Sequence, residues 1–276
     1  MKITGITAHE VGIPMQGVLM WAYSFSQHGY KDHVAIATPR TILQVHTDEG
    51  LTGIGEANSP KEYFEKTVAQ RIKGADPFHW RAIIAPEKDP HDRAGLEFAM
   101  WDLMGKYLGK PVAALLGGGQ YQREVSFSAY VFFRLPNMEG KNEVNLENHA
   151  EHCLELVKAY GFRSLKLKLG VHPYEDELRA VRRVREVVGP GPKIRIDPNS
   201  AWSIDQAINA ARVLEDVGIE YLEDVARGLE DQARLRAATR IPVCADGSYS
   251  LERLSHVIRQ QAAEVAMCDI YGSGGI

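Results

Sequence analysis

Acidic residues close four predicted strands in the second half of the chain. The segments KIRID, IEYLED, IPVCAD and EVAMCD each end in a carboxylate, and the strand before them, SLKLKLG, carries two lysines. One such acid is usually the N-cap of the next helix. In a parallel α/β sheet, however, the carboxyl ends of the strands meet at one edge, so four acids beside a lysine pair indicate a shared site. The side chains concerned are Lys166, Lys168, Asp197, Glu223, Asp246 and Asp269.

The chemistry of such a site follows from its charge. Three carboxylates gathered at one point repel each other unless a hard cation lies among them, and an all-oxygen ligand set suits Mg²⁺. The sequence shows no His/Cys set of the kind that favours zinc. A divalent cation disfavours protonation of nearby lysines, and a lysine with a pKa of roughly 7–8 can act as a general base near neutral pH. The combination suits removal of a proton α to a carboxylate, because the cations stabilise the enediolate.

The lysine strand alternates strictly between leucine and lysine. Side chains alternate between the two faces of a strand, so Leu165, Leu167 and Leu169 share one face and the two lysines share the other. Lysines on one face are common on solvent-exposed edge strands. The acids on the following strands favour the other interpretation, in which the lysines face a site and the leucines pack against surrounding helices.

After Gln122 the sequence alternates between strand-like and helix-like segments, the pattern of a parallel sheet with right-handed crossovers. Such a pattern fits either a doubly wound sheet or a (β/α)8 barrel. The glycine-rich segment LGGGQ follows a helix instead of a strand, so it does not match a dinucleotide-binding loop, and the barrel is favoured. The predicted strands are 125–133, 162–169, 193–197, 218–224, 241–246 and 264–270.

The first 124 or so residues read as an α+β unit. Strands are predicted at 1–13 and 40–57, the second broken by a turn at 48–50, and a helix is predicted at 92–112. Between the two strands, residues 14–39 form a long unpatterned stretch rich in aromatic residues. A loop of this length in a compact domain is usually functional or disordered, and its aromatic content argues against disorder.

Composition limits the classes of function. The 276 residues are 45% hydrophobic and 25% charged, which is ordinary for a globular protein, and a net charge of −4 gives no electrostatic argument for nucleic acid or an anionic membrane. No apolar run approaches the roughly 20 residues that a membrane span needs. The three cysteines are odd in number and lack metal-type spacing. We therefore expect a reduced, cytoplasmic protein.

The ordered set of motifs resembles the enolase superfamily, in particular its mandelate racemase/muconate lactonizing enzyme-like group. The segments AMWDLMGK and PVAALLGG, the Lys-x-Lys strand and DPNSAW all match in order. Spacings of 26 residues between Asp197 and Glu223, and of 23 between Glu223 and Asp246, also match. The resemblance covers essentially the whole chain. It implies an α+β capping domain at 1–124 and an enolase-type (β/α) barrel, a modified TIM barrel, at 125–276.

The resemblance also implies roles for single residues. Asp197, Glu223 and Asp246 are expected to bind Mg²⁺, Lys168 to be the base that takes the α-proton, and Lys166 to tune Lys168 and help bind the substrate carboxylate. The remaining residues implied in the site are Asn199 as a substrate contact, Asp269 as the partner that orients a histidine of the seventh strand, and Trp21, Tyr23 and His28 in the loop that closes over the substrate.

The sequence departs from the family pattern at its end. It stops at GSGGI, after the sixth predicted strand, whereas a closed barrel needs two more βα units. We therefore expect the chain to be incomplete, without the histidine partner of Asp269 and with an open barrel. Val225 stands where the family often has proline, and ADGS replaces the commoner ADES. These differences bear on the subfamily more than on the fold.

The expected function is that of an Mg²⁺-dependent dehydratase of a sugar acid, which gives a 2-keto-3-deoxy acid. One alternative is a racemase or epimerase of a 2-hydroxy or amino acid, because both reactions begin with removal of the α-proton. A second alternative is a barrel without catalytic activity. The expected partner is a small-molecule carboxylate, with no nucleic acid and no membrane, and the resemblance implies a homo-oligomer.

Overall fold

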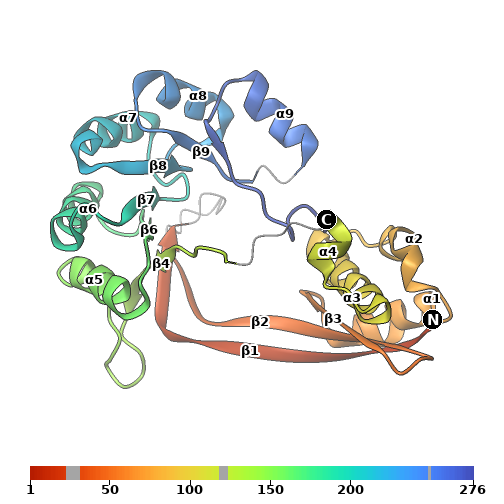
Figure 1. The fold of residues 1–276 in the computed structure, drawn as a ribbon. Helices are drawn as coiled ribbons and strands as arrows, with labels where there is room; N and C mark the ends of the chain where they lie inside the picture. Colours follow the sequence, from red (N-terminus) through yellow and green to blue (C-terminus); the bar gives the residue numbers. More distant parts are fainter. Residues whose placement is uncertain (23–31, 118–123, 248–249) are drawn as a thin grey trace. The chain divides into compact units, whose positions relative to one another are not determined.

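A computed structural model describes residues 1–22, 32–117, 124–247 and 250–276 (Figure 1). The chain divides into two compact units. The first comprises Met1–Pro14, Ala37–Val125 and Cys268–Ile276, and the second comprises Met15–Ile36 and Ser126–Met267. The boundary between residues 124 and 125, inferred from sequence, stays a prediction.

Long strands replace most of the loop that the sequence predicts at 14–39. Strand β1 (Ile3–Ala22) continues well past residue 13, and β2 (Asp32–Thr47) begins before residue 40. The extension of β1 has a physical reason, because Val18–Met20 pairs antiparallel with β5 (Phe133–Leu135). The loop prediction is therefore wrong at both ends, and its centre lies outside the described residues. With β3 (Thr52–Ala57) these strands form a sheet in the order β3-β2-β1-β5.

The predicted helix of the first unit is α3 (Pro90–Leu108). Asp89 caps it by accepting hydrogen bonds from the backbone N–H groups of residues 91 and 92, and Gly109 ends it with φ +62°. The helix packs so closely on β3 that a Cβ on Gly55 would lie 1.9 Å from the carbonyl oxygen of Gly95. Only glycine allows that approach. The unit also contains η1 (Tyr63–Val68), α1 (Ala69–Ile72), η2 (Pro77–His79), α2 (Trp80–Ile84) and α4 (Val112–Gly117).

The second unit contains a sheet of six parallel strands in the order β10-β9-β8-β7-β6-β4, with helices along its outer side (Figure 1). This confirms the predicted strand–helix alternation. The strands are β4 (Ala129–Val131), β6 (Ser164–Lys168), β7 (Lys193–Asp197), β8 (Ile219–Glu223), β9 (Val243–Ala245) and β10 (Val265–Ala266). The helices are α5 (His149–Tyr160), α6 (Tyr174–Val188), α7 (Ile204–Val213), η3 (Glu215–Val217), α8 (Gly228–Ala238) and α9 (Leu251–Arg259).

One predicted strand is divided in the structure. Residues 125–133 were expected to form a single strand, but β4 pairs parallel with β6 whereas β5, which begins at Phe133, pairs antiparallel with β1. The chain therefore passes from one sheet to the other at this point. Hydrophobic alternation alone does not reveal such a change, because both sheets bury the same kind of side chain.

The leucines of β6 pack as the sequence predicts. Leu165, Leu167 and Leu169 are completely buried, and they belong to the hydrophobic core that also contains Cys153 of α5 and Val181 of α6. Burying a leucine side chain stabilises a fold by roughly 1.5–3 kcal/mol. The strand is therefore fixed on its outer face, which leaves its lysines on the inner one.

Two expectations from composition can be compared with the described residues. None of their helices combines the length and the apolar character that crossing a membrane requires. Cys153 and Cys244 are free thiols, and both are buried. Burial raises the pKa of Cys153 to about 12, so this thiol is an inert part of the core.

Candidate active site

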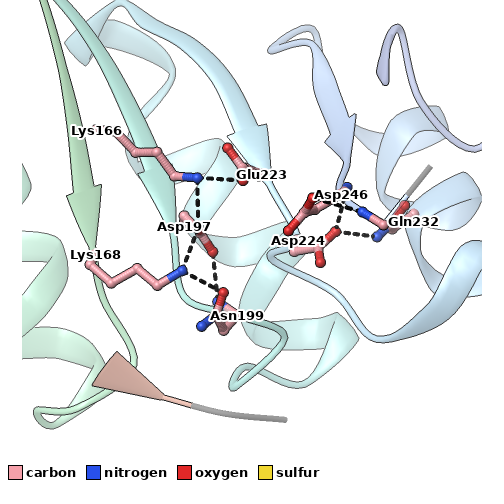
Figure 2. Close-up of polar contacts among 9 residues, drawn as sticks. Lys166, Lys168, Asp197, Asn199, Glu223, Asp224, Gln232 and Asp246 are labelled. Carbon is pink, nitrogen blue, oxygen red and sulfur yellow. Dashed lines mark hydrogen bonds and ion pairs between the residues drawn. The ribbon is translucent and has the colours of Figure 1, made fainter. Parts of the chain in front are cut away.

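The lysine pair lies opposite a carboxylate of the neighbouring strand. Lys168 of β6 is in register with Asp197 of β7, and the residue is 5% exposed. Its Nζ lies 2.6 Å from Asp197 Oδ2 and 2.5 Å from Asn199 Oδ1 (Figure 2). The structure thus brings together the predicted base, one predicted metal ligand and the predicted substrate contact.

Lys166 connects the same carboxylate to the next strand. Its Nζ lies 3.0 Å from Asp197 Oδ2 and 2.5 Å from Glu223 Oε1, at the end of β8. Burial acts to lower the pKa of Lys166, but the negative charges of Asp197 and Glu223 outweigh it and raise the pKa above the usual lysine range. The protonated lysine is therefore the stable form in this arrangement.

Glu223 has one carboxylate oxygen that the described residues leave without a partner. The residue is 1% exposed, Oε1 accepts from Lys166, and Oε2 is buried with no hydrogen bond from the described part of the chain. Burial, followed by the negative charges of Asp197 and Asp246, raises the pKa of Glu223 to about 7. A buried acceptor among like charges is the feature that a bound cation would satisfy.

Asp246 follows β9, and two hydrogen bonds of backbone N–H groups help to hold it. Its N–H donates to Asp224 Oδ1 at 3.1 Å, and its own Oδ1 accepts from the N–H of Gly247 at 2.7 Å. Figure 2 shows this pair of aspartates beside Glu223 and separate from the two lysines. The negative charge of Asp246 also raises the pKa of Glu223, so the three predicted ligands share one electrostatic environment.

The described residues contain no group of three or more His, Cys, Asp or Glu side chains that is already arranged to hold a metal ion. The lysine ammonium groups lie against the carboxylates of Asp197 and Glu223 instead. The donor set still fits Mg²⁺, because it is all-oxygen, negatively charged and includes the unpartnered Glu223 Oε2. Metal binding would draw these carboxylates away from the lysines.

Four predicted site residues lie outside the second unit or have side chains outside the described residues. Asp269 lies in the first unit, where its carboxylate accepts hydrogen bonds from the N–H groups of Tyr271 and Gly272, each at 3.1 Å. The side chain of Trp21 and the whole of Tyr23 and His28 lie outside the described residues. Their predicted roles stay predictions.

An aromatic pair missed by the sequence analysis lies beside the lysines. Tyr130 of β4 is in register with Lys166, and its ring centroid lies 4.8 Å from Lys166 Nζ and 5.7 Å from Lys168 Nζ. The ring of Phe132 packs on it, with centroids 4.5 Å apart. Alternation in the predicted strand 125–133 was the available signal, since it places these two residues on one face.

A buried glutamate behind the lysine strand was also missed. Glu177 of α6 is completely buried and accepts hydrogen bonds from the backbone N–H groups of Gly170, Val171 and His172 at 2.7–3.0 Å. It therefore fixes the loop that follows Lys168. Burial raises the pKa of Glu177 to about 7, against the lowering effect of these N–H donors. In the sequence it looks like an ordinary acidic residue of a first helical turn.

The parallel sheet, its outer helices and the strand-end carboxylates define an α/β domain of the enolase type. The model of the enolase C-terminal domain-like family matches residues 148–276. The model of the mandelate racemase/muconate lactonizing enzyme N-terminal domain matches residues 33–117. The chain belongs to the enolase superfamily, in its mandelate racemase and muconate lactonizing enzyme group.

Curated relatives include both dehydratases and racemases. The chain is 31% identical over 278 residues to a probable glucarate dehydratase of Streptomyces coelicolor, an alignment that covers 87% of this chain and 64% of that protein. It is 27% identical over 296 residues to an N-succinyl-L-Arg/Lys racemase of Bacillus cereus, covering 100% of this chain and 74% of the relative. The chain thus spans less than two thirds of the dehydratase.

Solved structures match the same architecture. An enolase from Thermobispora bispora, crystallised with magnesium and formate, superimposes with a TM-score of 0.84 at 29% identity. The match covers 100% of this chain and 70% of that chain. This likeness supports the enolase-superfamily fold, with an N-terminal cap and a C-terminal barrel-like domain.

Proposed function

We propose that this chain carries the site of an Mg²⁺-dependent enzyme that removes the proton α to a carboxylate, and that the reaction is dehydration of a sugar acid. The observation that carries the proposal is the contact of Lys168 and Lys166 with Asp197 and Glu223, next to the buried unpartnered oxygen of Glu223. A general base, a second cation and an all-oxygen ligand set are what this chemistry requires.

Each residue has a role in this proposal. Asp197, Glu223 and Asp246 would hold Mg²⁺, which when bound compensates the negative charge that develops on the substrate carboxylate. Lys168 takes the α-proton at Nζ, and Asn199 Oδ1, 2.5 Å away, orients that ammonium group. Lys166, released from Glu223, holds the substrate carboxylate. A protonated group then donates a proton to the β-hydroxyl, which leaves as water, and tautomerisation of the resulting enol gives a 2-keto-3-deoxy acid.

A racemase or epimerase is the second candidate. Its support is the match to the N-succinyl-L-Arg/Lys racemase, which extends over 100% of this chain. Both reactions begin with transfer of the α-proton to Lys168. They differ in whether a leaving group departs or a proton returns on the opposite face. In either case Asp269 is proposed to orient a histidine, and the substrate is proposed to be a small-molecule carboxylate taken up by a homo-oligomer.

Proton NMR in D2O separates the candidates. The protein is incubated with Mg²⁺ and a panel of sugar acids, 2-hydroxy acids and acylated amino acids. Loss of the α-proton signal with appearance of a 2-keto-3-deoxy product supports the dehydratase. Loss of the signal with the carbon skeleton intact supports the racemase. No exchange with any acid, while Mg²⁺ binds, contradicts both.

A further inference from the structure

The hydrogen-bond ladder between β8 and β9 is irregular at its end, where the N–H of Asp246 donates to a side chain instead of a backbone carbonyl. In a regular parallel ladder, a residue donates its N–H to one residue of the neighbouring strand and accepts, through its C=O, from the residue two positions further on. Asp224 donates its N–H to the carbonyl of Cys244 at 3.1 Å. The N–H of Asp246 should therefore donate to the backbone carbonyl of Asp224.

The carboxylate of Asp224 takes the place of that carbonyl. The residue has φ +42°, a conformation that few non-glycine residues adopt, so its backbone turns out of the strand. Its carbonyl oxygen accepts instead from the N–H of Ser200 at 2.5 Å. The N–H of Asp246 is left to the side chain, and it donates to Asp224 Oδ1 at 3.1 Å (Figure 2).

The Asp224 carboxylate is itself fixed by α8. Gln232, which is 3% exposed, donates from Nε2 to the same Oδ1 atom at 3.0 Å. Asp224 Oδ1 thus accepts two hydrogen bonds. One comes from the backbone N–H of Asp246, a predicted metal ligand, and the other comes from the side-chain amide of the buried Gln232. Through its carbonyl, the same residue holds the turn that contains Asn199 and Ser200, which also have positive φ values of 47° and 56°.

We propose that Asp224 is a positioning residue, which acts through Oδ1 and its backbone carbonyl to set the place of Asp246 relative to the Asn199–Ser200 turn. It does not itself bind the metal or the substrate. The proposal deepens the proposed function, on which the metal role of Asp246 rests. The hydrogen bonds themselves are independent of that function, so the two ideas can fail separately.

Two variants separate the acceptor from the backbone conformation. Asp224→Gly adopts positive φ freely but lacks the acceptor. Asp224→Asn tolerates positive φ and keeps a carbonyl oxygen that can accept both hydrogen bonds. Gln232→Met, which removes only the donor from α8, serves as a matched control for loss of the supporting contact. Circular dichroism and urea unfolding establish that each variant is folded.

Two measurements decide the proposal. Hydrogen exchange of the Asp246 segment, followed by mass spectrometry without metal, should be faster in Asp224→Gly than in Asp224→Asn. Mn²⁺ affinity, measured by calorimetry, should fall roughly 10–100-fold in Asp224→Gly, the usual effect of losing a group that orients a ligand, and much less in Asp224→Asn. Gln232→Met should lie between them.

Equal exchange in the glycine and asparagine variants would overturn the proposal, whatever the metal result. Equal loss of Mn²⁺ affinity in both would also overturn it, because the charge and not the acceptor would then matter. If the parental chain binds no Mn²⁺, the metal site of the proposed function is wrong, and the exchange data alone decide the role of Asp224.

Discussion

Two buried glutamates of the second unit, Glu177 and Glu223, differ in how their oxygens are used. Burial raises the pKa of each to about 7. The carboxylate of Glu177 accepts hydrogen bonds from three consecutive backbone N–H groups. Glu223 is paired through one oxygen with Lys166, and its other oxygen has no partner among the described residues.

The difference separates a residue that holds the fold from one that is proposed to do chemistry. A fully satisfied buried carboxylate stabilises the loop around it, and nothing remains for a ligand. A partly satisfied carboxylate among other negative charges is costly unless a cation binds. Variants of the two glutamates should therefore change different properties of the protein.

The largest effect is expected at Lys168, whose Nζ contacts Asp197 and Asn199. Replacing Lys168 with Ala should reduce α-proton exchange by roughly 10²–10⁴-fold, because the general base is lost. The measurement is NMR exchange in D2O with Mg²⁺ and an acid that the parental chain accepts. Urea unfolding of the same variant checks that the fold persists. Unchanged exchange would show that Lys168 is not the base.

Replacing Glu223 with Gln should weaken Mg²⁺ binding by more than the roughly 10–100-fold that loss of an orienting group costs. The amide keeps an acceptor for Lys166, so the free energy of unfolding without metal should change little. Calorimetric titration with Mg²⁺ or Mn²⁺ measures the affinity. Equal metal affinity in the variant and the parental chain would remove Glu223 from the proposed ligands.

Replacing Glu177 with Ala should lower the free energy of unfolding, the property that Glu223→Gln should change little. One buried and two partly buried N–H groups lose their acceptor. Each buried group left without a partner costs about 1–3 kcal/mol, so we expect a loss of about 3 kcal/mol in the free energy of unfolding. Glu177→Gln keeps one accepting oxygen and should restore most of that stability. Urea unfolding gives both values. Equal stability of the two variants would contradict the role assigned to the carboxylate.

A smaller, pH-dependent effect is expected from His149. Its ring is completely buried and stacks on Phe133 at 4.5 Å, and neither ring nitrogen has a hydrogen-bond partner among the described residues. Burial, and then the nearby His152 and His172, lower the pKa of His149 from 6.5 to about 3. The folded state therefore keeps the ring neutral, and its stability falls as the pH drops from 6.5 towards 3.

The unfolded chain takes up a proton at His149 below pH 6.5, whereas the folded chain does not do so until about pH 3. The free energy of unfolding should therefore be about 2 kcal/mol lower at pH 5 than at pH 7. Urea unfolding at the two pH values measures it. His149→Phe, which cannot take up a proton, is the control and should lose less stability on acidification. The same pH dependence in both proteins would show that His149 does not titrate as described.

The fold of the second unit was largely predictable because its pattern is local. The alternation in β6 defines which face is buried, and Leu165 and Leu167 are completely buried as expected. The passage of the chain from one sheet to the other at Phe133 was not predictable, because it depends on pairing with β1, which is far away in the sequence. For the same reason, the strand that continues to Ala22 was predicted to be loop.

The site was predictable where the type of residue at or near a strand end is enough to indicate its role. Lys168, Asp197 and Asn199 come together as the sequence indicated. The sequence analysis did not assign a role to Asp224, because its function follows from a positive φ and a displaced carbonyl that no pattern shows. Its role depends on backbone geometry, which emerges only when neighbouring strands are in register.

The most direct test of the central claim is the exchange of the α-proton for deuterium in D2O, with and without Mg²⁺, for the parental chain and Lys168→Ala. The account predicts Mg²⁺-dependent loss of the α-proton signal of an acid substrate by the parental chain, and little or none by the variant. Exchange that persists in Lys168→Ala, or that proceeds equally without Mg²⁺, would contradict it.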